Sequence, residues 1–283
     1  MSQAEDPYVY PGTPVLRNKL GILNARRLSL AEDRRAGVRY AMLLDDLPRP
    51  PFTFDTLKDI HRTLFQDVYS WAGQPRTTSI GKRETDDADS PVTWFARPGT
   101  IEDEAARIFD RLAQARFLIG LGRPEFAATA AEVLGAVNDL HAFREGNGRA
   151  QRLLVAALGH NAGHPVSFDV VTRERMVATS IAASRGDLGG LVRLLDDATD
   201  PRRSGALRMA LDAIRKHSAG DWNSLYVATM QAGQQYRGIV AGRAGTDFML
   251  RAEGLPGAWV AVGDARDLPS TARTGDLVTV AAT

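Results

Sequence analysis

Twelve residues in the middle of the chain, His141 to Arg152, combine side chains that could do chemistry on a phosphate group. The string holds a histidine, an acidic residue, a Gly-Asn-Gly turn and, after the turn, two arginines. An imidazole exchanges its proton near neutral pH, so His141 is a candidate general base. These residue types, in this order, predict a base beside an anion-binding site.

The turn formed by Gly146, Asn147 and Gly148 is typical of an anion-binding loop. Glycine adopts positive φ angles easily, and the turn can therefore expose consecutive backbone N–H groups. It also opens the helix expected next, so these N–H groups and the helix dipole point at the same spot. We predict that the three residues cradle phosphate oxygens.

The charged residues around the turn suit the same ligand. Arg149 and Arg152 are three positions apart and share one helix face, where both could clamp phosphate oxygens. Glu145 could hold Mg²⁺, which prefers one or two carboxylates together with substrate phosphates. Each feature alone has an ordinary structural explanation, as a helix end, a connector or a solvated face. Their coincidence within twelve residues is hard to attribute to packing.

Helices are expected to position this string, because the pattern of the first 204 residues is mostly helical. Pro124 suits the first turn of the helix that precedes His141, and the apolar run Leu153–Leu158 indicates a central, buried helix. We predict helices over residues 24–45, 54–69, 100–117, from 124 to the histidine, from 153, over 174–184, and over 187–197 with Asp187 as N-cap.

The character of the chain changes after Gly205, which predicts a domain boundary near residue 204, inside the sequence DPRRSG. One more helix, Ala206–Lys216, precedes short β-like runs separated by Gly and Pro, as in a small β-barrel or meander. These runs are Tyr236–Val240, Phe248–Arg251, Trp259–Val262 and Leu277–Val280. Between Trp71 and Pro98 the helical pattern breaks, which predicts a long exposed loop with room for a short hairpin.

Composition and charge exclude several classes of protein. The 283 residues are 44% apolar and 24% charged, as in a globular protein with a buried core. A net charge of +1 argues against a protein that coats nucleic acid or an anionic membrane. The absence of cysteine excludes disulfides and thiol nucleophiles. No secretory signal opens the chain and no run approaches the ~18 apolar residues of a membrane helix, so we expect folding in the cytoplasm.

The string from His141 to Arg152 resembles the Fic motif, HxFx(D/E)GNGRxxR, and matches it at every defining position. Upstream, Val68–Thr77 resembles the segment that leads into the Fic substrate flap. Tyr10–Thr13 and Leu16–Ile22 resemble the N-terminal signature of a subgroup found in type IV-secreted bacterial effectors and related toxins. In that subgroup a small OB-like β-domain follows the Fic core.

The resemblance implies a mainly α fold. Residues 1–204 would form a Fic helical catalytic domain with a short β-hairpin flap, and residues 205–283 a small OB-like β-domain. The implied activity is that of a protein adenylyltransferase, which transfers AMP from Mg-ATP to a Ser, Thr or Tyr hydroxyl of a target protein and releases pyrophosphate. Kinase-like relatives carry Lys at the second motif glycine, whereas this chain has Gly148, so AMP transfer is favoured over phosphoryl transfer.

The resemblance also implies a role for each motif residue. His141 would deprotonate the target hydroxyl, and Phe143 would pack inward as a structural anchor. Glu145 would bind Mg²⁺. The phosphates would be held by Gly146, Asn147, Gly148, Arg149 and Arg152. The flap would align the target backbone by strand addition, through Thr77, Thr78, Ser79, Ile80, Gly81 and Lys82. The charged excursion Lys82–Asp89 is either a solvated loop or a reader of complementary charges on one target.

Many Fic enzymes carry an inhibitory helix, (S/T)xxxE(G/N), whose Glu pairs with the second motif arginine, here Arg152. In this chain Thr100–Glu104 comes close, but Ala105 follows it, and we interpret it as an ordinary helix start. We therefore expect a separate antitoxin-like protein to supply the inhibitory Glu. Relatives modify small GTPases and topoisomerases, and either class could supply the target. The expected location is the bacterial cytoplasm, with translocation into a host or recipient cell as a further expectation.

Three alternatives stay open at this point. The same site could transfer another nucleotide or phosphate-linked group. A protein of another class could bind nucleic acid through the C-terminal β-domain; residues 219–283 hold aromatic side chains but five Arg, no Lys and six acidic residues, and such aromatics without a basic groove are more often core. His160 and His164, four positions apart, could ligate a metal, but they suggest a helix end and no third ligand stands out.

Overall fold

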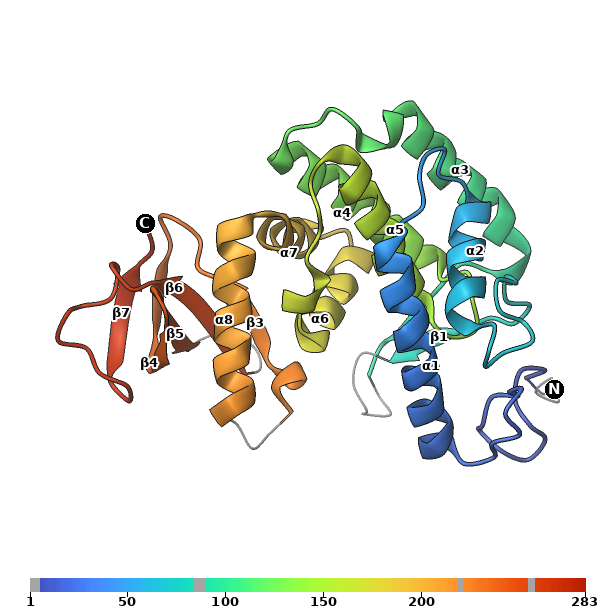
Figure 1. Cartoon of the computed structure of the whole chain (residues 1–283), viewed down its shortest axis with the longest axis horizontal. Helices are drawn as coiled ribbons and strands as arrows, with labels where there is room; N and C mark the ends of the chain where they lie inside the picture. Colours follow the sequence, from blue (N-terminus) through green and yellow to red (C-terminus); the bar gives the residue numbers. More distant parts are fainter. Residues whose placement is uncertain (1–5, 84–89, 218–220, 254–257) are drawn as a thin grey trace. The chain divides into compact units, whose positions relative to one another are not determined.

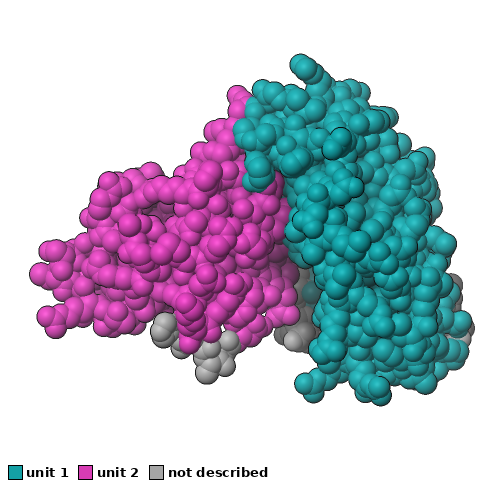
Figure 2. All heavy atoms as spheres, viewed as in Figure 1, with its two compact units in different colours: residues 1–121, 132–165 teal, residues 122–131, 166–283 magenta. Residues whose placement is uncertain are grey.

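The computed structural model describes residues 6–83, 90–217, 221–253 and 258–283. The chain divides into two compact units, shown in different colours in Figure 2. Unit 1 contains Met1–Leu121 and Glu132–Pro165, and unit 2 contains Gly122–Ala131 and Val166–Thr283. Helix α4 (Arg123–Leu140) contributes residues to both units.

The described part of unit 1 is mainly helical, with a short hairpin and a non-helical N-terminal segment before α1. Its helices besides α4 are α1 (Ala25–Asp45), α2 (Phe54–Phe65), α3 (Ile101–Gln114) and α5 (Asn147–Ala162), with 3₁₀ turns at Pro98–Thr100 and Arg116–Leu118. Helix α5 packs against α1 and α2 (Figure 1), and its apolar run Leu153–Leu158 is buried throughout. The expectation of a central helix there is confirmed. The helix begins earlier, at Asn147, because the glycine turn leads directly into it.

Unit 2 packs helices against a curled sheet. Its helices are α6 (Arg173–Ser184), α7 (Gly189–Thr199) and α8 (Pro201–His217), with 3₁₀ turns at Phe168–Val170 and Trp222–Ser224. Its strands are β3 (Tyr226–Thr229), β4 (Gln235–Ala244), β5 (Asp247–Ala252), β6 (Trp259–Asp264) and β7 (Leu277–Ala281). Among the described residues they form a five-stranded sheet in the order β3-β6-β5-β4-β7, in which β3 and β6 are parallel and the other pairs antiparallel.

The alternation of side chains gives this sheet two apolar faces. Helix α8 lies against one face (Figure 1), where Leu207 and Leu211 pack with Val227, Met249 and Val262. The other face forms a second core cluster of Met230, Val240, Phe248, Leu250, Ala261, Leu268, Val280 and Ala282. The four predicted β runs are confirmed as β4 to β7, within a few residues at their ends.

Three details of the secondary structure differ from the sequence predictions. The helix expected from Ala206 starts earlier, at Pro201. The boundary predicted near residue 204 therefore lies inside α8 and not in a linker. The division of the chain into two domains at that residue stays a prediction. Strand β3 was missed because it is only four residues long and lacks alternation. Helix α7 begins at Gly189 with Leu188 as its N-cap, so the expectation of Asp187 as N-cap was wrong by one residue; the Asp187 carboxylate still accepts a hydrogen bond from the Gly189 N–H at 2.9 Å. None of the helices described is both long and apolar enough to span a bilayer.

We expect Gly238→Ala to lower the free energy of unfolding of unit 2. Gly238 lies in β4, paired with both β5 and β7, and a Cβ there would stand 2.2 Å from the carbonyl oxygen of Arg251. Because that atom belongs to the backbone, the strands must shift to make room for the methyl group. We expect this to lower the free energy of unfolding by about 1–3 kcal/mol. Urea unfolding followed by circular dichroism measures the change.

Gly205→Ala is the matched control. Gly205 lies inside helix α8, and a Cβ there would meet no heavy atom within 4 Å. Alanine should therefore stabilise the helix by up to about 1 kcal/mol. Equal unfolding midpoints for the two variants would contradict this account of the sheet.

Candidate active site

His141 follows directly on helix α4 and is held in an unusual backbone conformation, with φ of 42°. Its backbone N–H donates to the carbonyl oxygen of Val137 at 3.2 Å. The ring atom Nδ1 lies 3.1 Å from the carbonyl oxygen of Asn138. Since a carbonyl can only accept, Nδ1 carries a proton in this contact, and Nε2 of the neutral ring keeps a free lone pair.

The surroundings of His141 keep its imidazole neutral. The residue is 5% exposed, and its ring stacks on Phe95 with centroids 3.7 Å apart. Burial is the main cause that lowers the pKa of His141 to about 3, and the positive charges of Lys82 and Arg76 act in the same direction. At pH 7 the ring is therefore neutral and Nε2 keeps its lone pair, but a pKa this far below the near-neutral value expected from the sequence makes it a weaker base than an ordinary imidazole.

Asn147 braces the loop between the two helices. Its Oδ1 accepts a hydrogen bond from the Phe143 N–H at 2.9 Å, and its Nδ2 donates to the Phe143 carbonyl oxygen at 2.7 Å. Both ends of the side-chain amide are thus hydrogen-bonded to the backbone of Phe143. Asn147 and Gly148 are the first two residues of α5. Because the first N–H groups of a helix have no partner within it, the backbone N–H groups of these two residues are the ones available to an anion.

The two motif glycines are required for different reasons. Gly146 has φ of 82°, and a Cβ there would stand 2.3 Å from the Phe65 ring, so both conformation and packing demand glycine. Gly148 is exposed, has ordinary helical geometry, and would place a Cβ no closer than 3.8 Å to Arg152. A side chain at Gly148 would fit the protein itself, but it would occupy the space in front of the helix N-terminus.

The charged motif residues differ in how far they are already paired. Arg149 lies over the Phe65 ring and forms ion pairs with Glu32 and, at 3.2 Å, Asp33, both on α1. Arg152, half-buried on the same helix, makes no ion pair with any residue the structure describes. Glu145 is exposed, and its Oε1 accepts a hydrogen bond from the Gly146 N–H at 2.9 Å.

The predicted hairpin is confirmed. Strands β1 (Gly81–Arg83) and β2 (Val92–Trp94) pair antiparallel, with Lys82 opposite Thr93. Of the flap residues predicted above, Gly81 and Lys82 lie in β1, while Thr77, Thr78, Ser79 and Ile80 lead into it. All of β1 is exposed. The charged excursion beyond Arg83 lies at residues 84–89, outside the described residues.

A model of the Fic/DOC family matches residues 51–158. A probable protein adenylyltransferase from Sinorhizobium fredii is 37% identical over 188 residues, which are 66% of this chain and 92% of that protein. The chain belongs to the Fic/DOC family. A protein adenylyltransferase from Bartonella henselae is 33% identical over 258 residues, 87% of this chain but 47% of that protein. This Fic chain thus spans about half the length of that relative.

Solved Fic structures agree with the fold. The type IV secretion system effector protein BepA matches with a TM-score of 0.84 and 30% identity, covering 97% of this chain and 95% of that chain. The BepC protein from Bartonella tribocorum, solved with bound AMPPNP, matches with a TM-score of 0.62 and 32% identity over 69% of this chain and 96% of that chain.

Arg76 is a site residue that the sequence pattern did not reveal. Its guanidinium is 2% exposed and donates to carbonyl oxygens of three segments. Nε donates to His141 at 2.8 Å, Nη1 to Thr78 at 2.8 Å, and Nη2 to Ala96 and, at 3.5 Å, to Leu140. The two ends of the flap and the start of the Fic motif therefore share one cation. Nothing local in the sequence marks this role.

His61 is a second residue that was missed. Its Nδ1 accepts the Gly73 N–H at 2.9 Å, so the proton sits on Nε2, which donates to the Glu145 carbonyl oxygen at 2.9 Å. The ring stacks on Phe143 at 3.8 Å, and Phe143 itself is buried. Burial lowers the pKa of His61 to about 4, so the ring is neutral at pH 7 and supports the motif from behind.

The N-terminal segment braces the same region. The Tyr8 hydroxyl accepts a hydrogen bond from the Thr77 N–H at 3.0 Å, next to the flap. Asp6 pairs with Arg144, inside the motif, at 2.8 Å. Of the other histidines, His164 Nε2 lies 2.8 Å from the Leu121 carbonyl oxygen and His160 is exposed. Among the described residues, no cluster of three or more His, Asp or Glu could hold a metal.

We expect Arg76→Lys to loosen the flap. Lysine keeps the charge but cannot reach three segments at once, so bonds to the flap carbonyls are lost. Amide hydrogen exchange of Gly81–Arg83 should become at least about tenfold faster, equivalent to about 1.4 kcal/mol. The matched control is Arg97→Lys, an exposed arginine near the flap. Unchanged exchange in Arg76→Lys would refute the proposed role.

We expect His61 to make stability pH-dependent. Its pKa in the folded chain, about 4, is below the ~6.5 of an unfolded histidine. The unfolded state therefore binds the proton first, and stability present above pH 6.5 is lost as the pH falls toward 4. Between pH 7 and 5, wild type should lose about 2 kcal/mol more than His61→Gln. Urea unfolding at both pH values measures this, and the exposed His160→Gln should behave like wild type.

Proposed function

We propose that this chain is a protein adenylyltransferase. A target hydroxyl loses its proton to Nε2 of His141 and attacks the α-phosphate of ATP; a bond to AMP forms, and pyrophosphate leaves. The observation that carries the proposal is the buried, neutral ring of His141, fixed through Nδ1 in the same loop as the open N-terminus of α5. The names of the curated relatives support the same activity.

The nucleotide phosphates are held by the helix end and its arginines. The backbone N–H groups of Asn147 and Gly148 suit an anion, and the Gly146 conformation is what aims them. Arg152 is available as it stands, whereas Arg149 must share its guanidinium with Glu32 and Asp33 or exchange them for phosphate oxygens. The AMPPNP bound in the BepC structure supports a nucleotide at this motif.

Glu145 is the residue that would hold Mg²⁺. It is exposed, one carboxylate oxygen is already oriented by the Gly146 N–H, and no second carboxylate competes within the motif. One carboxylate completed by phosphate oxygens and water is a donor set that Mg²⁺ accepts. The ion would offset negative charge on the phosphates when bound. The chain's own groups position the nucleotide and take the proton.

The target is a protein that presents a hydroxyl on an extended segment. Residues Thr77 to Lys82 lead into the exposed strand β1, which can pair with a target strand through backbone hydrogen bonds. The ring of Phe95, at the flap's return, packs on His141 and thereby couples the flap to the base. Small GTPases and topoisomerases stay candidate targets. Residues 205–283 are proposed as an OB-like domain.

Regulation by a separate antitoxin-like protein is part of the proposal. The Thr100 hydroxyl donates to Glu104 Oε1 at 2.5 Å at the start of α3. The Glu104 carboxylate therefore has a partner at the start of its own helix, in keeping with the interpretation of Thr100–Glu104 as an ordinary helix start. Arg152 makes no ion pair with the described part of the chain and is free to receive a Glu from a partner. The protein would act as a toxin in the bacterial cytoplasm or as an effector in a host or recipient cell.

The function is tested with ATP labelled at the α- or the γ-phosphate, incubated with a cell lysate. We expect target labelling from α-labelled ATP alone, reduced about 10²–10⁴-fold in His141→Ala because a general base is lost. His160→Ala, at an exposed histidine, should label like wild type. Label from γ-labelled ATP would overturn AMP transfer, and stronger labelling from GTP, UTP or CTP would identify another nucleotide.

A further inference from the structure

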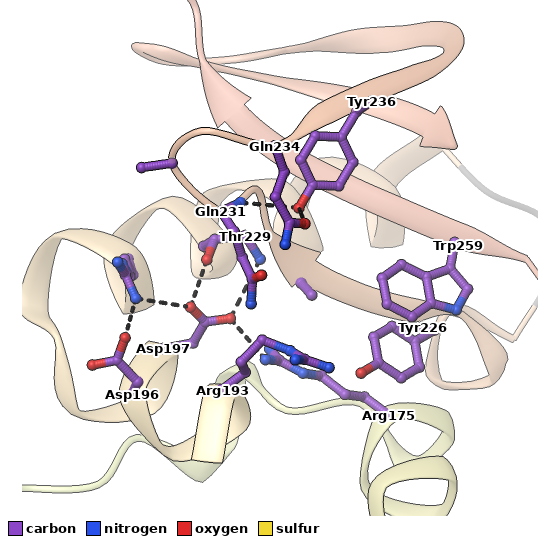
Figure 3. Close-up of a pocket in the computed structure, with 13 residues that line it drawn as sticks. Arg175, Arg193, Asp196, Asp197, Tyr226, Thr229, Gln231, Gln234, Tyr236 and Trp259 are labelled. Carbon is purple, nitrogen blue, oxygen red and sulfur yellow. Dashed lines mark hydrogen bonds and ion pairs between the residues drawn. The ribbon is translucent and has the colours of Figure 1, made fainter. Parts of the chain in front are cut away.

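Unit 2 contains a cavity of about 490 Å³ that the adenylyl transfer does not use (Figure 3). It is lined by β3, the start of β6, the turn after β3, and side chains from α6, α7 and α8. None of the lining residues belongs to the Fic motif or the flap. The volume lies within the roughly 300–1,000 Å³ range of small-molecule sites.

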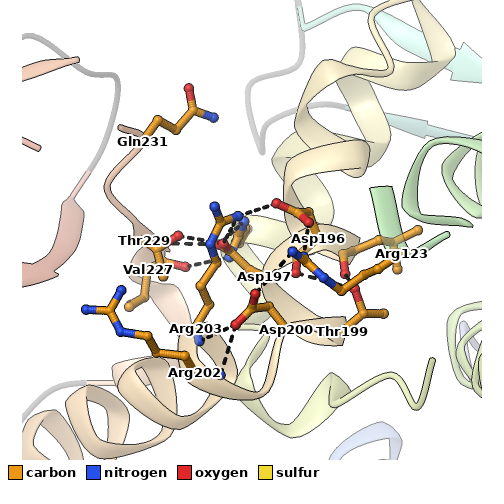
Figure 4. Close-up of polar contacts among 12 residues, drawn as sticks. Arg123, Asp196, Asp197, Thr199, Asp200, Arg202, Arg203, Val227, Thr229 and Gln231 are labelled. Carbon is orange, nitrogen blue, oxygen red and sulfur yellow. Dashed lines mark hydrogen bonds and ion pairs between the residues drawn. The ribbon is translucent and has the colours of Figure 1, made fainter. Parts of the chain in front are cut away.

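The two carboxylates beside the cavity are already neutralised (Figure 4). Asp197 is buried and accepts from Arg175 Nη2 at 2.8 Å and from the Thr229 hydroxyl at 2.5 Å. Asp196 is paired with both Arg123 and Arg203. Because each carboxylate has at least one arginine of its own, neither is left to repel an anion.

Two guanidinium groups are left with unused donors. Arg193 is exposed, lines the cavity, and makes no ion pair with the residues that the structure describes. Arg175 is buried, and its Nε–H has no hydrogen-bond partner in the described protein. A buried donor without an acceptor is unfavourable, because it has lost its hydrogen bonds to water. Arg193 is thus the exposed cation of the cavity lining, whereas the Arg175 Nε–H has almost no accessible surface.

An aromatic platform forms another wall. Tyr226 and Trp259 stand opposite each other on the parallel strands β3 and β6, and their rings stack with centroids 3.8 Å apart and planes at 9°. Tyr226 is buried, whereas Trp259 is half-buried at the cavity. A planar ring can extend this stack, as nucleic acid bases do on exposed aromatic side chains.

Amide groups complete the lining. The Tyr236 hydroxyl accepts from the Gln231 N–H at 3.0 Å and donates to Gln234 Oε1 at 3.1 Å, which orders the turn that borders the cavity. The side-chain amide of Gln231 and the NH₂ group of Gln234 can hydrogen-bond the edge of a heterocycle. Figure 3 shows these glutamines and Trp259 around the same space as Arg175 and Arg193.

We propose that this cavity binds a nucleoside monophosphate. The phosphate pairs with Arg193, the base stacks on Trp259, and the side chains of Gln231 and Gln234 hydrogen-bond the edge of the base. An uncharged heterocycle would leave the guanidinium of Arg193 without an ion pair, and an anion without a ring would leave the free face of Trp259 without a stacking partner. The ligand is therefore expected to carry both groups, and the site is independent of AMP transfer at His141.

Calorimetric titration of the full chain with AMP, adenosine and inorganic phosphate tests the site. AMP should bind at least about tenfold more tightly than either fragment. Arg193→Gln should weaken AMP at this site by about tenfold, and Trp259→Leu should do the same if circular dichroism shows it folded. Arg243→Gln, at an exposed arginine of β4 away from the cavity, is the matched control and should bind like wild type. AMP binding unchanged in Arg193→Gln would overturn the proposal.

The same titrations separate this site from the Fic motif. Binding of AMP to the cavity should be weakened in Arg193→Gln but retained in Arg152→Ala. AMP transfer should be retained in Arg193→Gln. Binding lost in Arg152→Ala and kept in Arg193→Gln would place the nucleotide at the motif alone and sink the second site. Failure of AMP transfer with the AMP titrations as expected would contradict the proposed function and leave the cavity site standing.

Discussion

The guanidinium of Arg76 is buried where the flap leaves the helical core and where it returns. It donates to carbonyl oxygens at Thr78 and Ala96, and also at His141. A buried cation is stable only when its donors are satisfied, so these carbonyls cannot move apart without leaving a charge unpaired. The position of the flap relative to the base is set by this constraint. Strand β1 and the ring of His141 are thereby held in a fixed arrangement relative to each other.

The buried residues of the Fic motif are held by hydrogen bonds and stacking, whereas Glu145 and Gly148 are exposed to solvent. Asn147 closes the loop on Phe143, His61 stacks on Phe143, and the Glu145 carbonyl accepts from His61. The groups that face outward, at Gly148 and Glu145, are exposed. This division lets the protein fix backbone N–H groups in place before any ligand arrives, which is what electrostatic preorganisation requires.

The neutral state of the two buried histidines follows from the same packing. Burial lowers the pKa of both His61 and His141 well below the ordinary value, yet the two rings differ in how many of their nitrogen atoms are engaged in hydrogen bonds. In His61 both nitrogens are engaged, by Gly73 and Glu145, so the ring can only support the loop. In His141 the ring contacts the Asn138 carbonyl oxygen through Nδ1, which leaves the lone pair of Nε2 free. The hydrogen-bond partners of each histidine thus decide whether its ring only supports the loop, as in His61, or keeps a free lone pair, as in His141.

The sequence by itself determined the chemistry of the motif and most of the elements. From His141 to Arg152 the base, the turn and the arginines are neighbours along the chain, so their spacing alone predicts a base beside an anion site. Helical periodicity predicted α1 to α7, and alternation predicted β4 to β7, because both signals are local.

Contacts between distant segments were decided by the tertiary structure alone. Arg76 meets His141 across 65 positions, His61 meets Glu145 across 84, and Arg149 meets Glu32 across 117. Strand β3 exists because Tyr226 pairs with Trp259, and that pairing also builds the aromatic wall of the second cavity. Such partners leave no trace in a local pattern, since an arginine that will be buried and one that will be solvated are the same residue until the chain has folded around them.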